Sequence, residues 1–403
     1  MLGHKSIREI LDDDLATITL PASLLLDRAN DEIEVPTDPR FLIASRVELF
    51  RQRAASSYLD ILRAFCQNRC RIRRTLCHTI VDWDSVQLDA EELDVELRAL
   101  TKEKPISDRT ISDDPIYAFP LSSWAYYYKL LQMEWIVSLG FELETYAPSE
   151  MAGMYWYLQY LCKTRSSHLE RIRGFTMRAY TSFSRSSSSS PSPSQTSIAT
   201  EKEYMKSLSF INFSILQCAA TISFADSLSA LYEVLRRLSL LPSPSSSNNP
   251  NEPQYTTSIM RHELRFKPFS SIGLPSLPSF ADFTAQVTQP GESTLTMLEF
   301  AADAQASAKK GFEILGKLKK EESFCRGSAE SWVKDVKGCL KACIFAGIAV
   351  AGVKKAWLES EKRSGERNGN GNGKVLGIKV EIPETGKGYH AWWVVPKIIP
   401  VPP

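Results

Sequence analysis

The sequence predicts an all-α fold: a multi-helix scaffold with a small C-terminal β-hairpin and loops rich in Ser, Pro and Asn that we expect to be disordered. Three observations lead to this prediction. Long segments without Pro or Gly repeat their apolar residues about every 3.6 positions, the helical period. Alternation typical of strands occurs only near the C-terminus. Tracts of Ser, Pro, Asn and Gly separate the helical segments.

The same pattern divides the 403-residue chain into four parts. Residues 1–241 are expected to form a helical scaffold with an aromatic-rich helix pair and a disordered insertion at 184–197. Residues 242–292 are expected to be a linker and 293–361 the C-terminal helices. A Gly/Asn-rich loop and the hairpin tail would occupy 362–403. A chain of this length has enough apolar material for a substantial core.

Composition excludes several classes of protein. The formal net charge is +1, so no overall field attracts the chain to nucleic acid or an anionic membrane. Eight cysteines are too few for a disulfide framework, and the N-terminus lacks the apolar stretch of a signal peptide. The uncharged run Ala342–Val353 is shorter than the about 20 residues of a membrane span. We therefore expect a cytoplasmic protein without a membrane partner.

The first two helices predicted along the chain are Leu42–Ile80 and the shorter, acidic Asp84–Leu100. Four candidate metal ligands lie on the first of them: Cys66, Cys70, Cys77 and His78. A straight helix would place the three cysteines on one face but separate the last two by about 10 Å of rise, too far for one tetrahedral ion. We interpret them as small core residues and expect no metal site.

An arginine cluster on the same helix has two interpretations. Its members are Arg69, Arg71, Arg73 and Arg74. Internal ion pairing is favoured, because a buried guanidinium without a partner is costly. Carboxylates for such pairs are available at Asp82, Asp84 and Asp89–Glu96. The alternative is a basic patch that binds ribosomal RNA or another polyanion.

Two long aromatic-rich helices are predicted over Leu121–Leu143 and Glu150–Phe175, with Pro148 suited to the start of the second. Consecutive aromatics, as in Tyr126-Tyr127-Tyr128 and Tyr155-Trp156-Tyr157, surround most of each helix, so both helices need cover on every side. This pattern indicates either a central core pair or contact with another subunit, since Tyr and Trp also suit interfaces.

The candidate core or partner contacts on this pair share large or charged side chains. They are Trp124, Tyr127, Tyr128, Glu134, Trp135, Tyr146, Met154, Tyr155, Trp156, Tyr157 and Tyr160. We favour the core for Trp135 and leave Trp156 open between core and interface.

Further helices are predicted over Lys202–Leu241, as one or two helices, and over Ser293–Lys320 and Ser328–Glu361. The terminal hairpin would join Val375–Ile382 to Ala391–Ile399, with a proline near the end that favours an edge strand.

Three low-complexity tracts interrupt these elements: Ser184–Ser197, Pro242–Pro253 and Ser364–Gly373. They lack the apolar side chains that would offset the entropy of ordering them, so we expect disordered loops.

Catalytic signatures are missing. The sequence has no G-x-x-x-x-G-K-[ST] phosphate loop, no G-x-S-x-G elbow and no H-E-x-x-H motif. An acetyltransferase of the GNAT type needs a [QR]-x-x-G-x-[GA] turn for the coenzyme pyrophosphate. Arg367 is followed at the required position by Asn370 instead of glycine. We expect no catalytic residue, no cofactor and no enzyme activity.

The aromatic segments resemble a known family. Leu121–Trp135, Gly140–Tyr146 and Glu150–Leu161, together with Cys66–His78, are similar to the large auxiliary subunit of the NatC N-terminal acetyltransferase complex. The resemblance is specific over about residues 46–161 and looser to residue 241. Family members carry an N-terminal Asp-Pro-x-Met-Asp element that this sequence lacks, so we expect the chain to match the central and C-terminal parts of the family.

The resemblance implies a non-catalytic scaffold. Such subunits hold a separate GNAT catalytic subunit and a small Sm-like subunit, and they help anchor the complex at the ribosome. The complex acetylates nascent chains that begin with Met followed by a large apolar residue. Two alternatives remain: a generic helical adaptor unrelated to acetylation, and a ribosome- or RNA-binding protein that uses the arginine cluster.

Overall fold

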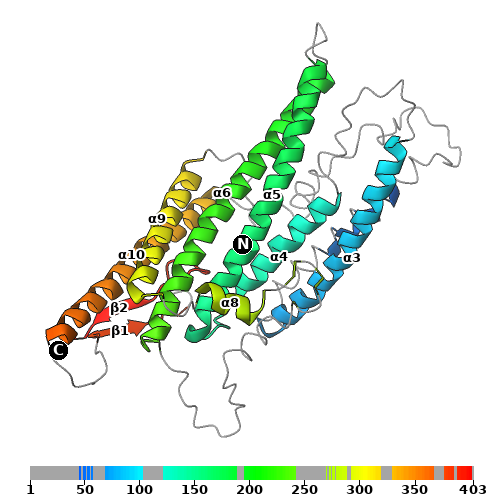
Figure 1. Ribbon diagram of the computed structural model, residues 1–403. Coiled ribbons are helices and arrows are strands. Elements are labelled where there is room, and N and C mark those ends of the chain that lie inside the picture. Colours follow the sequence, from blue (N-terminus) through cyan, green and yellow to red (C-terminus); the bar gives the residue numbers. More distant parts are fainter. Residues whose placement is uncertain are drawn as a thin grey trace, which may run out of the picture.

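Six long helices lie side by side in one row in the computed structural model of the protein, and each contacts the next (Figure 1). In order they are α3 (Arg69–Lys102), α4 (Leu121–Glu142), α5 (Met151–Ser187), α6 (Gln195–Arg237), α9 (Thr294–Lys317) and α10 (Ala329–Glu366). A short α8 (Phe280–Val287) and a sheet of β1 (Ile378–Glu381) and β2 (Lys397–Pro400) accompany them. The expected all-α fold with a small C-terminal sheet is confirmed.

The structure describes residues 45–46, 49–50, 52–54, 56–57, 69–102, 121–187, 195–241, 269, 272–273, 275–276, 278–287, 292–318, 329–366, 376–384 and 388–401.

The turn between α4 and α5 shows how local sequence sets the helix ends. Gly140 lets the ring of Tyr146 pack against α4, since a Cβ at this glycine would lie 2.0 Å from the ring Cζ. Pro148 then opens a 3-10 turn, η3 (Pro148–Glu150), that leads into α5. The Glu150 carboxylate accepts a hydrogen bond from the Ala147 N–H at 2.8 Å. Pro148 thus lies at a helix start, as the sequence predicts.

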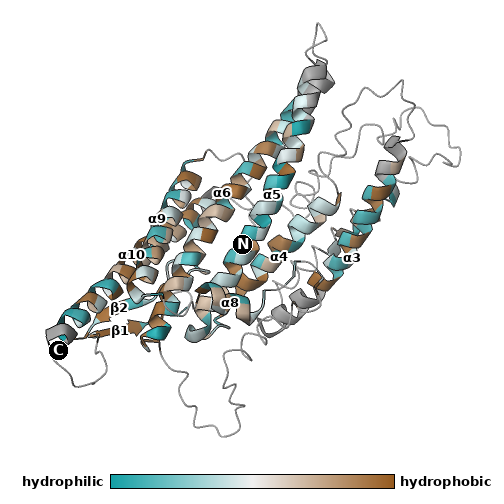
Figure 2. Ribbon diagram, viewed as in Figure 1, coloured by the Kyte–Doolittle hydropathy of each residue, from teal (hydrophilic) through white to brown (hydrophobic). Residues whose placement is uncertain are grey.

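Buried apolar residues form two clusters along the row. The larger cluster contains residues of α4, α5, α6, α9 and α10 and of the described residues 376–384 and 388–401, which we call the C-terminal segment. The smaller one joins α3 and α4 to Phe50 and to parts of α5 and α6. Trp135 and Ile222 are partly buried and pack against both clusters. Figure 2 shows hydrophobic and hydrophilic residues interspersed along the helices. α10, at the end of the row, buries one side and exposes another, whereas α4 is buried on nearly all sides.

Helix α3 begins at Arg69 and joins the end of the first predicted segment, Leu42–Ile80, to the second, Asp84–Leu100. It crosses the expected break at 81–83, because the buried residues Ile80, Trp83 and Val86 keep the helical period there. Lys202–Leu241, expected as one or two helices, lies mostly within the single helix α6.

The insertion expected at 184–197 is helical at both ends. α5 continues to Ser187 and α6 begins at Gln195, so only 188–194 lie outside the described residues. The Tyr180 hydroxyl of α5 donates a hydrogen bond to Glu201 of α6 at 3.1 Å. Pairing of the two helices therefore extends them into the serine-rich sequence.

The expected linker at 242–292 contributes to the core. It contains α8, and Phe269, Ile272 and Phe283 are buried in the larger cluster. Residues 242–253 and 367–373 of the other low-complexity tracts lie outside the described residues, whereas 364–366 form the end of α10.

The C-terminal segment is part of the core and not an appendage. β1 and β2 pair antiparallel, with Ile378 opposite Pro400. Between the strands the chain enters the larger cluster, where Trp393 and Val395 are each 2% exposed. β2 starts directly after Pro396, so the paired strands are shorter than the expected hairpin. A proline lacks the N–H that would extend the ladder.

Among the residues that the structure describes, two helical stretches are long and apolar enough to cross a membrane by length and composition alone: Tyr204–Arg237 in α6 and Trp332–Arg363 in α10. The α6 stretch lies between α5 and α9, and this position in the row accounts for its apolar composition. The α10 stretch buries one face against α9 and exposes another.

Candidate functional site

Three candidate contact residues of α4 lie in the smaller cluster: Trp124, Tyr127 and Tyr128. The ring centroids of Trp124 and Tyr128 are 4.5 Å apart. Trp83 of α3 stacks on Tyr128 with a centroid distance of 6.1 Å. α3 therefore covers this side of α4, and the three residues make core contacts within the chain.

Five more candidates lie in the larger cluster: Tyr146, Met154, Tyr155, Trp156 and Tyr157. Phe141 of α4 stacks on Tyr155 of α5, with ring centroids 4.3 Å apart and an interplanar angle of 12°. Burial raises the pKa of the Tyr155 and Tyr157 hydroxyls above the ordinary value of tyrosine. These aromatics hold α4 and α5 together instead of facing solvent.

Trp156 and Tyr160 hold the segment before α9 against α5. The Trp156 indole N–H donates a hydrogen bond to Gln286 Oε1 at 3.0 Å, and the Tyr160 hydroxyl donates to the Ser276 carbonyl at 2.7 Å. Trp156 is 3% exposed, so it is a core residue of this chain. Trp135 is partly buried where the two clusters meet.

Glu134, the charged member of the candidate set, forms a buried ion pair. Arg165 of α5 donates from Nε and Nη2 to the two carboxylate oxygens of Glu134 at 2.6 and 2.7 Å. This bidentate geometry satisfies both charges away from water. Burial raises the pKa of the nearby Cys218 thiol to about 12, so it remains a thiol and not a nucleophilic thiolate. The group joins helices and offers no reactive side chain.

A second charged pair joins α4 to α3. The Lys129 side chain, only 1% exposed, pairs with Asp84. The other oxygen of this carboxylate accepts from the Gly273 N–H at 3.1 Å, which ties the segment before α8 to α3. Burial lowers the pKa of Lys129, and the hydrogen bond to Asp84 opposes that shift.

The arginine cluster has its backbone in α3, but its side chains lie outside the described residues: Arg69, Arg71, Arg73 and Arg74. The same holds for Cys70, Cys77 and His78, and Cys66 itself lies outside. Three of the carboxylates expected to pair with the cluster bind other residues. Asp89 pairs with Arg53 and Glu96 with Arg46, while Asp84 pairs with Lys129.

The residues that hold the C-terminal segment were not found from the sequence. The Tyr155 hydroxyl donates to the Trp392 carbonyl at 3.0 Å and accepts from the Val394 N–H at 2.8 Å. The Tyr232 hydroxyl of α6 donates to the Val394 carbonyl at 2.9 Å. The available signal was the apolar run Trp392–Val395, which we assigned to a strand.

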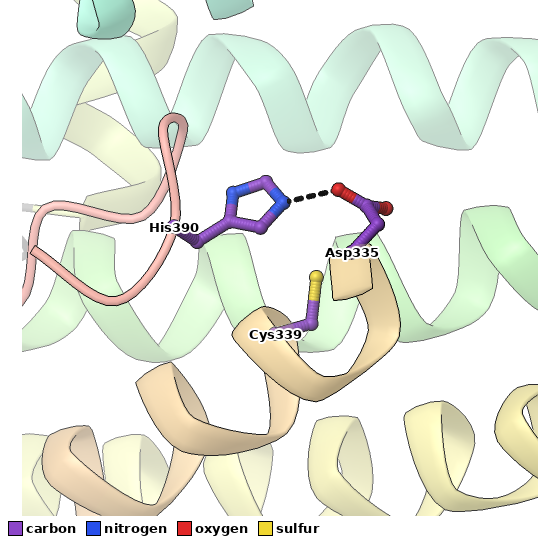
Figure 3. A group of neighbouring side chains, drawn as sticks. All are labelled: Asp335, Cys339 and His390. Atoms are coloured by element: carbon purple, nitrogen blue, oxygen red, sulfur yellow. Dashed lines mark hydrogen bonds and ion pairs between the residues drawn. The ribbon is translucent and has the colours of Figure 1, made fainter. Parts of the chain in front are cut away.

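Asp335, Cys339 and His390 form a group with the chemistry of metal ligands among the described residues (Figure 3). His390 Nδ1 accepts from the Trp392 N–H at 3.0 Å, so the neutral ring carries its proton on Nε2 and donates to Asp335 at 2.8 Å. A metal-bound histidine needs the opposite arrangement, with a lone pair toward the ion and its other nitrogen donating.

Cys339, the third member of this group, is buried. Burial and the charge of Asp335 raise the pKa of its thiol well above the usual value. We therefore interpret the group as a hydrogen-bonded contact that fastens the C-terminal segment to α10. His390 also contacts its own segment, because its Nδ1 accepts a hydrogen bond from the Trp392 N–H.

Comparisons with known proteins match the chain along most of its length. A family model described as "NAA35-like, TPR repeats" matches residues 1–363. The N-alpha-acetyltransferase 35, NatC auxiliary subunit, of Saccharomyces cerevisiae is 25% identical over 245 residues, which are 58% of this chain and 30% of the relative. The Homo sapiens protein of the same name is 28% identical over 168 residues, 38% of this chain and 22% of the relative.

Solved structures share the fold. A chain in the crystal structure of the NatC complex bound to Gag peptide and CoA matches with a TM-score of 0.63 and 16% identity, covering 100% of this chain and 52% of that one. A chain of the apo NatC complex matches with a TM-score of 0.62 and 17% identity, covering 90% of this chain and 50% of that one. The chain thus spans about half the length of these structures. It belongs to the NAA35-like family with TPR repeats.

Proposed function

We propose that this chain is a non-catalytic auxiliary subunit of a NatC-type N-terminal acetyltransferase complex, in which it holds a separate GNAT catalytic subunit. The observation that supports this most is the family match over residues 1–363. The relatives are named NatC auxiliary subunits, and the matching crystal structures are of NatC complexes.

The chemistry of the described residues favours a scaffold. Buried charged residues form ion pairs between neighbouring helices, as Glu134 does with Arg165 and Lys129 does with Asp84. Burial raises the pKa of the Cys218 and Cys343 thiols to about 12, so neither is an activated nucleophile. A row of helices in which each contacts its neighbours presents extended surfaces for partners.

The finer features of the proposal come from the resemblance. They are a small Sm-like subunit as a second partner, association of the complex with the ribosome, and a cytoplasmic location. The substrates would be nascent chains that begin with Met followed by a large apolar residue. The chain covers about half of the matching structures, so each of these properties needs its own test.

Co-expression of the tagged chain with a NatC-type GNAT subunit tests the proposal. We expect the two to elute together in size-exclusion chromatography and to transfer acetyl from acetyl-CoA to a Met-Leu peptide. The chain alone should transfer none, and the catalytic subunit alone is the control. Acetyl transfer by the pure chain, or separate elution of the two proteins, would contradict the proposal.

A further inference from the structure

α10 is the last helix of the row, and its two faces differ. The inner face packs on α9 and the C-terminal segment. Its buried residues are Val336, Cys339, Ala342, Cys343, Ala346, Ala349, Val350, Val353, Ala356 and Ser360. On the opposite face Ile344, Ile348 and Leu358 are 47%, 61% and 38% exposed. Exposed aliphatic residues in a row on one helix mark a surface that a partner can cover.

The spacing of this face is that of a coiled-coil seam. Alternating steps of four and three residues connect its positions, which we call the outer stripe: Lys337, Lys341, Ile344, Ile348, Ala351, Lys355 and Leu358. Such alternation keeps side chains on one line of a helix and suits knobs-into-holes packing against a second helix. Ala351 would allow close approach at the centre of the seam.

The charge of the outer stripe is one-sided. Lys337, Lys341 and Lys355 are exposed, and none of them forms an ion pair within the part of the chain that the structure describes. The neighbouring Lys354 is different, because it pairs with Glu299 of α9 at 3.0 Å. If α10 of a second copy of this chain packed on the outer stripe, its lysines would face the lysines of the first copy. Repulsion between these like charges disfavours such a dimer.

We propose that the outer stripe of α10 binds an amphipathic helix of a partner protein whose apolar seam is flanked by Asp and Glu. Ile344, Ile348 and Leu358 supply the apolar contacts, and the three lysines select the acidic flanks. The proposal does not rest on assembly with an acetyltransferase, because it uses only the exposed face of α10.

A synthetic helix can test this on the full chain. The probe is a fluorescein-labelled peptide of about four heptads with Ile at a, Leu at d and Glu at e and g; its glutamates suppress self-association. A second peptide carries Lys at e and g. In anisotropy titrations at low ionic strength we expect the Glu peptide to bind and the Lys peptide not to bind. Salt should weaken the complex.

Matched variants locate the binding. Ile348→Glu should weaken binding of the Glu peptide about tenfold or more, because it removes the most exposed apolar contact of the outer stripe and turns a carboxylate toward the glutamates of the peptide. Leu88→Glu on the outer face of α3 is the control, since Leu88 and Ile348 are both 61% exposed. It should leave the affinity unchanged. The double variant Lys341→Glu and Lys355→Glu should reverse the preference toward the Lys peptide.

Four results would overturn the proposal. The first is no binding of either peptide, and the second is equal binding of both. The third is self-association of the chain in sedimentation that Ile348→Glu abolishes, which would make a second copy the occupant. The fourth is binding to vesicles of phosphatidylcholine and phosphatidylserine in equal parts that Ile348→Glu abolishes while the Glu peptide fails to bind, which would indicate a membrane surface.

Discussion

Single charged residues decide how neighbouring helices meet in this protein. Glu134 of α4 and Arg165 of α5 have side chains 8% and 5% exposed, and each uses the other to satisfy its charge. Burying one charge without a partner is far more costly than burying a pair. The pair therefore permits one registry between α4 and α5 and penalises shifted ones.

Glu134→Ala should be strongly destabilising. It would leave the Arg165 guanidinium buried without a carboxylate, and breaking a buried pair costs about 3–5 kcal/mol of the free energy of unfolding. Urea denaturation of the full chain measures this change. Glu170→Ala, which removes an exposed pair with Arg173, is the control and should cost about 1 kcal/mol or less. Equal losses for the two variants would contradict the assigned role.

His168 should make the stability depend on pH. Burial lowers the pKa of this imidazole, and its Nε2–H donates to the Ser123 carbonyl at 2.7 Å. Below about pH 6.5 the unfolded chain binds a proton at this residue more readily than the folded chain does. Neutral His168 therefore makes its full contribution to the free energy of unfolding above that pH. This contribution is lost as the pH falls below it.

His168→Gln should remove this part of the pH dependence, since an amide can still donate to Ser123 but does not titrate. The urea midpoint of the variant should fall less than that of the wild type between about pH 7.5 and pH 5.5. Parallel curves for the two proteins would show that His168 does not contribute.

The C-terminal segment is the element whose role depends most on distant residues. Buried hydroxyls of Tyr155 on α5 and Tyr232 on α6 bind its backbone, and Trp393 packs among the aromatic rings of the larger cluster. The segment thereby covers the junction of α5 and α6. His390 and Asp335 fasten it to α10 as well.

Adjacent tryptophans of this segment should differ sharply in their effect on stability. Trp393 is buried and Trp392 is half-buried. Trp393→Ala should lower the free energy of unfolding by about 3–5 kcal/mol, the range for truncating a large core aromatic. Trp392→Ala should cost clearly less, because less of its apolar area leaves water. Thermal and urea unfolding measure both, and similar melting temperatures would mean that the segment is not packed as described.

The row of helices predicts uneven stability across the whole molecule. α5 and α6 project beyond the other helices at the end where α5 finishes and α6 begins (Figure 1). Met177 and Met205 there are about half exposed, whereas Phe224, Leu228 and Leu231 at the other end of α6 are fully buried. Segments with few buried contacts open at low free energy.

Amide hydrogen exchange should therefore differ along one helix. Amides of α6 between residues 195 and 207 should exchange faster than those between 220 and 235, by about tenfold or more, because the second region lies between α5 and α9. Mass spectrometry of peptic fragments measures this within a single sample. Uniform protection along α6 would show that the projecting end has cover beyond the neighbours described here.

The sequence by itself determined the helices and the family. Apolar periodicity is a local property, so α4, α9 and α10 appear close to their expected bounds, whereas α5 continues to Ser187, well beyond the expected end at Phe175. Consecutive aromatics such as Tyr155 and Trp156 predict that their helix needs cover on every side, because they leave it no polar face. The resemblance over residues 46–161 pointed to the family that the comparison establishes.

Only the tertiary structure decided what covers each residue. The partners of Tyr155 in the C-terminal segment are 237 and 239 residues away, and no local pattern encodes such a contact. The same applies to the pairing of Asp84 with Lys129, where several basic residues were available in the sequence. Composition and apolar period predict that a side chain is buried, but they do not identify the residues that it packs against. Those residues depend on which helix surfaces the row brings into contact.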